Sequence, residues 1–142
     1  MEDAYRLQRF VDAQKKDYAN ALQEIMNGKK RSHWMWYIFP QIEGLGYSEL
    51  SIYYAIKNLH EAIDYLEHPI LGKRLIEISK ALLDLTTNNA TEIFGSPDDM
   101  KLRSCMTLFA GVPDADPVFA AVLKKFFNET RDEKTLKIMQ RY

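Results

Sequence analysis

The residue types that could carry out chemistry gather in the segment 29–48 of the sequence. This segment holds both tryptophans of the chain, one of its three histidines and a glycine-containing loop. Trp34, Trp36 and Phe39 could form the walls of a pocket that stacks a planar ring. Such a pocket needs few polar contacts, and the segment offers Ser32, His33, Gln41 and Ser48. The pattern predicts a small-molecule site.

Neighbouring aromatic residues also occur in hydrophobic cores, because large rings bury much area when they pack together. Residue types alone favour such a core plug over a pocket, and both interpretations stay open. Ser32 and His33 are not expected to act together as nucleophile and base. Their side chains would point apart in a strand and lie far apart around a helix, and no Gly-x-Ser-x-Gly turn surrounds the serine.

The residues around this segment suggest an anionic ligand. Gly44 and Gly46 precede Ser48, which is predicted to cap a helix. Free backbone N–H groups at a helix start can hold a phosphate, and glycines let it approach. Arg9 and Lys101 could add positive charge for such a ligand, which could resemble a nucleotide. The alternative is a tight turn into a capped helix, and the acidic residues on both sides of the loop favour it.

No metal or cofactor site is predicted. His60, Asp64 and His68 are spaced by four residues, so a continuous helix would place them on one face, where they could bind zinc. Pro69 is expected to end that helix at His68, which removes the third ligand. Cys105 is the only cysteine, so an intrachain disulfide is excluded and a reducing cytoplasm is the simplest compartment.

Charge and hydropathy exclude several kinds of partner. The 19 basic and 20 acidic residues give a formal charge of −1, so no overall field attracts nucleic acid or an anionic membrane. The first eight residues lack the apolar stretch of a signal peptide, and no apolar run approaches the roughly 20 residues of a membrane span. We expect a cytoplasmic protein without nucleic-acid or membrane partners; its oligomeric state stays open.

The elements that must position these residues are predicted to be helical. The chain has 142 residues, which suits one domain over 1–142. Apolar residues at three- and four-residue spacing, helix-capping residues and prolines at helix starts predict six helices. They cover about 4–27, 49–67, 69–85, 97–109, 117–127 and 132 to the end, with a single turn at 91–94. We expect an all-α orthogonal bundle, with a short strand-like segment near Trp34–Phe39.

Three stretches of the sequence resemble one family. They are Ser-His-Trp-Met-Trp-Tyr-Ile-Phe-Pro-Gln at 32–41, His-Pro-Ile-Leu-Gly-Lys-Arg-Leu at 68–75 and Lys-Leu-Arg-Ser-Cys-Met-Thr-Leu-Phe at 101–109. By these motifs the chain resembles DUF1810, a bacterial family of unknown function. The resemblance implies a mainly helical fold and no established activity. It also strengthens the pocket interpretation, because a purely structural plug would not require the polar residues that accompany the aromatic ones.

From Ser48 onward, the order of segments is also similar to that of the NADAR family, which is linked to N-glycosidic and ADP-ribose chemistry. That resemblance implies Glu49 as an acid or base, and phosphate contacts from Arg74, Lys101 and Arg103. Three hypotheses follow. The first is a small-molecule binding domain, and the second is a hydrolase or N-glycosidase that uses His33 or Glu49 in the same pocket. The third is a protein-interaction module with exposed tryptophans.

Overall fold

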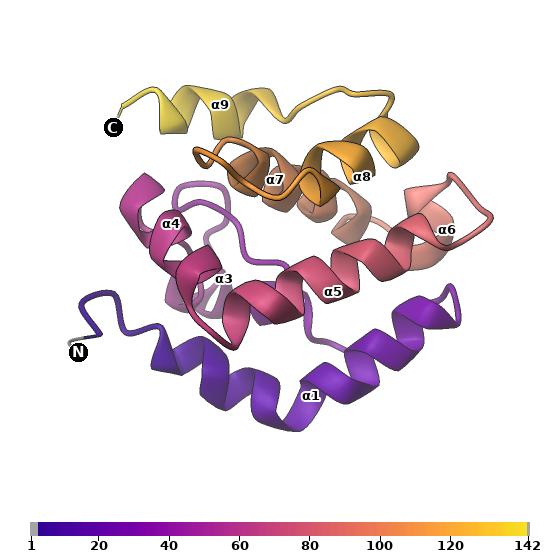
Figure 1. Cartoon of the computed structure of the whole chain (residues 1–142), viewed down its shortest axis with the longest axis horizontal. Coiled ribbons are helices and arrows are strands. Elements are labelled where there is room, and N and C mark those ends of the chain that lie inside the picture. The colour runs from indigo at the N-terminus through magenta and orange to yellow at the C-terminus, as the bar shows by residue number, and fades with distance from the viewer. Residues whose placement is uncertain (1–2, 142) are drawn as a thin grey trace.

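The computed structural model describes residues 3–141, and within this range it contains nine α-helices and no β-strand (Figure 1). The predicted all-α class is confirmed. In chain order the helices are α1 (Gln8–Met26), α2 (Met35–Ile38), α3 (Glu49–Tyr53), α4 (Leu59–Glu67), α5 (Leu71–Leu83), α6 (Ala90–Phe94), α7 (Asp98–Ala110), α8 (Val118–Phe127) and α9 (Glu133–Met139). The predicted number of six was too low because three of these helices have only four or five residues.

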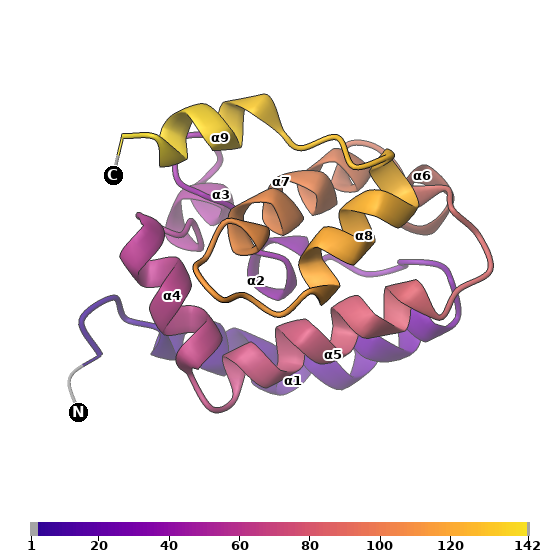
Figure 2. The same ribbon diagram turned by 45° about the horizontal axis from the view of Figure 1, so that its top comes forward.

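Helix α7 lies at the centre of the molecule. It packs against α6, α8 and α9, while α5 lies between α1 and α8 (Figure 2). Residues 104–109 of α7 are all buried. The helix therefore lacks the single apolar stripe of a surface helix, since it meets neighbours on several sides.

The segment Trp34–Phe39 is helical and not strand-like, which corrects the sequence prediction. The backbone N–H of Ile38 donates to the carbonyl of Trp34 over 3.2 Å, and that of Phe39 donates to Met35 over 3.1 Å. These four-residue steps are those of an α-helix. A short run that is apolar on every side carries no periodicity, so the sequence could not distinguish one helical turn from a strand.

The helix predicted over 49–67 is divided into α3 and α4. Between them, Ile56 pairs with Ile42 in a single parallel bridge. Its N–H donates to the carbonyl of Gln41 and its carbonyl accepts from the N–H of Glu43, both over 2.8 Å. Asn58 then starts α4 by accepting from the backbone N–H three residues later. Asparagine is a common capping residue, but the apolar periodicity on both sides of Asn58 predicted one continuous helix.

One buried carboxylate fixes the tryptophan segment to α1. Oε1 of Glu24 accepts hydrogen bonds from the backbone N–H groups of Arg31 (2.7 Å) and Ser32 (3.0 Å) and from the indole N–H of Trp34 (3.0 Å). Oε2 accepts from the Ser32 hydroxyl and the Asn20 amide, both over 2.7 Å. Burial by itself raises the pKa of Glu24, but these hydrogen bonds outweigh it and lower the pKa from 4.5 to about 2.

A buried ion pair fixes the other end of the region. The guanidinium of Arg9 lies 2.8 Å from Oε2 of Glu61, and both side chains are almost fully buried. The same guanidinium donates to the carbonyls of Tyr53 and Ala55, each over 2.9 Å, and to that of Tyr5 over 2.6 Å. Arg9 thus ties the end of α3 to α1, and its charge is compensated inside the protein.

We predict that Glu24→Gln lowers the free energy of unfolding at neutral pH by about 1–3 kcal/mol, because an amide cannot accept from all five donors. A lowered pKa in the folded state stabilises the fold above the unfolded value of 4.5, and this contribution is lost as pH falls from 4.5 towards 2. The difference between wild type and variant should therefore shrink over that range in urea unfolding. Glu67→Gln, at an exposed position of α4, is the control. A difference that does not change with pH would contradict this assignment.

We also predict that Arg9→Met lowers the free energy of unfolding by about 3–5 kcal/mol, because it leaves the Glu61 carboxylate buried without its partner. Adding Glu61→Leu should recover part of the loss, since the double variant buries no unpaired charge. Urea unfolding of the two single variants and the double variant gives the coupling energy. If the losses in free energy of unfolding of the two single variants simply add in the double variant, Arg9 and Glu61 are not energetically coupled, which would contradict the ion pair.

Candidate functional site

A cavity of about 130 Å³ lies beside the glycine loop. Its wall includes five residues that the sequence analysis selected, namely Trp36, Gln41, Gly44, Gly46 and Lys101. The wall is completed by apolar and polar residues of the loop 42–45 and of the segment 51–55. The cavity is therefore bordered by α2, the glycine loop, α3 and the first turn of α7.

Two polar groups on this wall have no hydrogen-bond partner among the described residues. Neither the indole N–H of Trp36 nor the side-chain amide of Gln41 makes a hydrogen bond to any residue in 3–141. Both side chains are half-buried. A polar group that is half-buried and unpaired is available to a ligand or to water.

The positive charge at the cavity comes from Lys101. Its Nζ lies 5.6 Å from the centroid of the Trp36 ring and 3.3 Å from Oδ1 of Asp98. The other carboxylate oxygen of Asp98 is 2.9 Å from Nζ of Lys30, which is almost fully buried. The Asp98 carboxylate therefore forms ion pairs with two ammonium groups, those of Lys30 and Lys101. Glu43 also lines the cavity, and its side chain is exposed.

The two glycines shape the loop and do not form a phosphate cradle. Gly44 has a φ of +106°, which favours glycine. A Cβ on Gly46 would lie 2.7 Å from the Cβ of Ser51, so glycine is needed for the loop to approach α3. Ser48 caps α3 as predicted and accepts from the N–H of Ser51 over 3.1 Å. That N–H is one a phosphate would have used, and α3 has only five residues.

Trp34 and Phe39 belong to the core and not to the cavity wall, which corrects their predicted position. Trp34 is 1% exposed and Phe39 is fully buried. Their ring centroids are 6.1 Å apart, and each ring also contacts Phe94. Because the indole N–H of Trp34 is donated to Glu24, this residue presents no free group to a ligand. The core-plug interpretation therefore holds for these two aromatic residues, while Trp36 lines the cavity.

The other predicted site residues also lie away from the cavity. Arg9 forms an ion pair with Glu61, and the hydroxyl of Ser32 donates to Glu24. His33 and Glu49 are exposed and are not part of the cavity wall. Neither candidate acid–base is therefore placed where it could act on a molecule held beside Trp36.

The phosphate contacts implied by the NADAR resemblance are not brought together. Arg74 lies over the ring of Tyr18, with 5.0 Å between the guanidinium carbon and the ring centroid. Arg103 faces Asp132 at 3.7 Å. Only Lys101 reaches the cavity. The three cations thus have different partners on different elements.

Sequence reasoning missed Asp98, Lys30 and Tyr54. The spacing of Asp98 and Lys101, three residues apart in one helix, was a visible signal of their ion pair. Lys30 reaches Asp98 from a distant part of the chain, and no local pattern indicates such a contact. Tyr54 lines the cavity because the chain turns after α3, where a continuous helix had been predicted.

The described part of the chain can be compared with the requirements of a metal site and of a membrane-spanning helix. No group of three or more His, Cys, Asp or Glu side chains within 3–141 could hold a metal ion. His68 accepts from the backbone N–H of Ile70 over 3.1 Å and so takes part in the start of α5. Burial raises the pKa of the Cys105 thiol, which keeps it protonated. No helix in residues 3–141 is long and apolar enough to span a membrane.

Comparison with known proteins supports the family that the motifs suggested. The chain is similar to a solved structure described as the conserved hypothetical protein Rv1873 from Mycobacterium tuberculosis. The two share 43% sequence identity and a TM-score of 0.95, over 97% of this chain and 99% of that chain. No match was found among curated proteins. Residues 4–139 match the model of the family described as "Protein of unknown function (DUF1810)". The chain therefore belongs to the DUF1810 family.

Proposed function

We propose that the protein binds a small planar anion in the cavity beside Trp36. The observation that carries this proposal is the position of Lys101, whose ammonium group lies 5.6 Å from the Trp36 ring centroid on the cavity wall. An aromatic face and a cation on one wall suit a ligand that combines a ring with a negative charge. Hydrogen bonds from the unpaired N–H groups of Trp36 and Gln41 would orient the ligand in the cavity.

The size of the cavity limits the ligand. A volume of about 130 Å³ is close to that of an engineered protein cavity, roughly 150 Å³, that holds benzene. It therefore suits one ring. A whole nucleotide would extend into solvent, so only its base or another single ring would be enclosed.

The positions of the candidate residues favour small-molecule binding over the hydrolase and the protein-interaction hypotheses. His33 and Glu49 do not line the cavity, so neither supports a hydrolase or N-glycosidase. Trp34 is 1% exposed and Trp36 is half-buried, which does not suit an exposed tryptophan hot spot. On the basis of its sequence and family, we expect the protein to bind its ligand in the bacterial cytoplasm.

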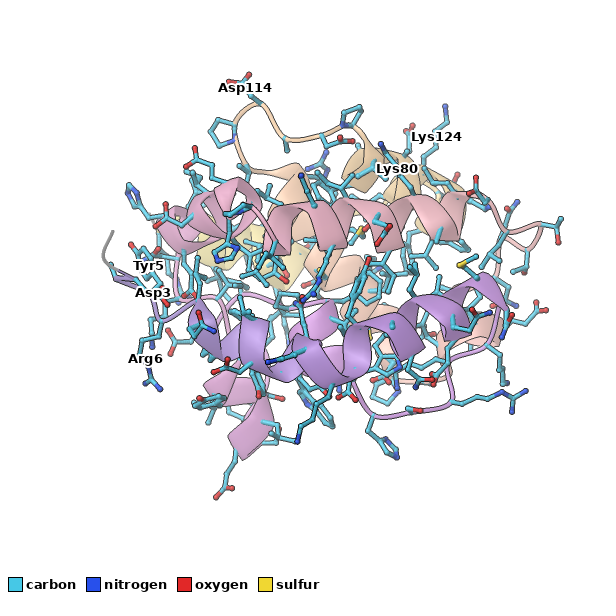
Figure 3. All side chains as sticks on the ribbon, turned by 60° about the horizontal axis from the view of Figure 1, so that its bottom comes forward. Asp3, Tyr5, Arg6, Lys80, Asp114 and Lys124 are labelled. Carbon is cyan, nitrogen blue, oxygen red and sulfur yellow. The ribbon has the colours of Figure 1, made fainter. Side chains whose placement is uncertain are left out.

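We predict that benzoate and phenyl phosphate bind more tightly than the neutral benzamide, as measured by tryptophan fluorescence and calorimetry. Lys101→Met should weaken binding of the two anions by about tenfold or more, because a charged hydrogen bond contributes roughly 1.5–3 kcal/mol. Binding of benzamide should change little. Lys124→Met removes an exposed lysine of α8 and is the matched control (Figure 3).

Asp98→Asn should act in the opposite direction in the same assay. It removes the carboxylate that competes for Lys101, so both anions should bind more tightly than to wild type. Equal binding of benzoate and benzamide, or anion binding that survives Lys101→Met, would overturn the proposed function. Weaker anion binding by Asp98→Asn would instead show that Asp98 is needed to position Lys101.

A further inference from the structure

A second cavity also borders α3, at Tyr53. It is an open groove of about 370 Å³ between α1 and the region around α3. Its aromatic lining consists of Tyr37, Tyr53 and Tyr54. The ring centroids of Tyr37 and Tyr54 are 5.1 Å apart, and those of Tyr53 and Tyr54 are 4.8 Å apart. Tyr53 is 47% exposed, so part of this aromatic surface is open to solvent.

The charged residues of the groove leave a negative excess. Asp12 and Asp17 line it from α1, together with Lys16. Arg9 also lines the groove, but its charge is compensated by the buried carboxylate of Glu61. Among the lining residues, two carboxylates therefore face one uncompensated ammonium group, and the exposed guanidinium of Arg6 lies beside them over the Tyr53 ring.

In each of these two carboxylates, the described residues leave one oxygen free to accept a hydrogen bond from a ligand. Oδ1 of Asp12 accepts from the Gln8 amide over 2.9 Å, and Oδ2 of Asp17 accepts from the hydroxyl of Tyr37. The second oxygen of each carboxylate has no hydrogen-bond partner among residues 3–141. The groove thus combines aromatic faces with two free acceptors.

Guanidinium groups of the protein itself already lie over rings at this end of the molecule. The guanidinium carbon of Arg6 lies 5.9 Å from the centroid of Tyr53, and that of Arg9 lies 4.3 Å from the centroid of Phe10. Arg6 is exposed at the N-terminal end of α1, near Asp3 and Tyr5 (Figure 3). Phe10 is buried and does not line the groove, so only the Arg6 contact bears on it. A guanidinium ligand at Tyr53 would have to replace the exposed side chain of Arg6 there.

We propose that this groove binds a guanidinium group, with the plane of the cation on the tyrosine rings and its N–H groups directed to Asp12 and Asp17. A guanidinium suits the groove better than an ammonium ion because it is planar, weakly hydrated and donates in several directions. The group could belong to a free small molecule or to an arginine side chain of a partner. This proposal is independent of the cavity beside Trp36.

The test uses N-propylguanidinium and its uncharged planar analogue N-propylurea, titrated into the isotopically labelled protein and followed by NMR. We expect N-propylguanidinium to shift the signals of α1 and of Tyr53 and Tyr54, and N-propylurea to leave them unchanged. Asp12→Asn should weaken guanidinium binding about threefold to fivefold, and Lys16→Gln should strengthen it by a similar factor. A purely structural effect would not produce these opposite signs.

Tyr53→Ala should weaken binding about twofold to fivefold, because the exposed aromatic face is lost. Tyr47→Ala is the matched control, since Tyr47 is 88% exposed and does not line the groove. Equal effects of the two probes, or affinity that both Asp12→Asn and Tyr53→Ala leave unchanged, would overturn the proposal. An acetylated and amidated Gly-Arg-Gly peptide distinguishes the sources. Tighter binding of this peptide than of N-propylguanidinium supports an arginine of a partner, and tighter binding of N-propylguanidinium supports a free small molecule.

Discussion

The carboxylate of Glu24 determines how the characteristic segment of this protein lies on the fold. Its five hydrogen bonds draw the chain after α1 back onto that helix and orient the Trp34 indole into the core. Such a buried charge is tolerated only because donors surround it, and the same donors keep it ionised. With Trp34 held in this way, the single turn of α2 directs Trp36 to the cavity. The aromatic core and the candidate site are thus two consequences of one interaction.

The ion pair between Arg9 and Glu61 makes a second constraint, on α3. None of the five residues of α3 is buried, so the helix gains little from packing and depends on its ends. Arg9 binds the carbonyl of Tyr53, and the Ile42–Ile56 bridge closes the base of the loop. Held in this way, α3 borders both the cavity beside Trp36 and the tyrosine groove, and Tyr54 lines both. The two proposed sites differ in charge because Lys101 faces one and Asp12 and Asp17 face the other.

The sequence predicted the class of the fold and several helices, because their signals are local. Prolines placed the starts of α7 and α8 within a residue or two, and α7 also has an acidic first turn. The site was predicted only in part. In a strand, Trp34 and Trp36 would share a face. On a helical turn, residues two apart point about 200° away from each other, so one tryptophan is in the core and the other lines the cavity. The role of Glu24 could not be predicted, because its partners depend on how the chain folds back after α1.

Trp34 belongs to the core, whereas Trp36 lines the cavity. Hydrogen exchange of their two indole N–H protons tests this difference most directly. NMR resolves the two protons, and titration with benzoate can be followed in the same samples. The Trp34 proton, donated to buried Glu24, should exchange slowly and keep its chemical shift. The Trp36 proton should exchange fast and should be the one that shifts when benzoate is added. Fast exchange at Trp34, or a benzoate-induced shift at Trp34 with none at Trp36, would contradict this account of the site.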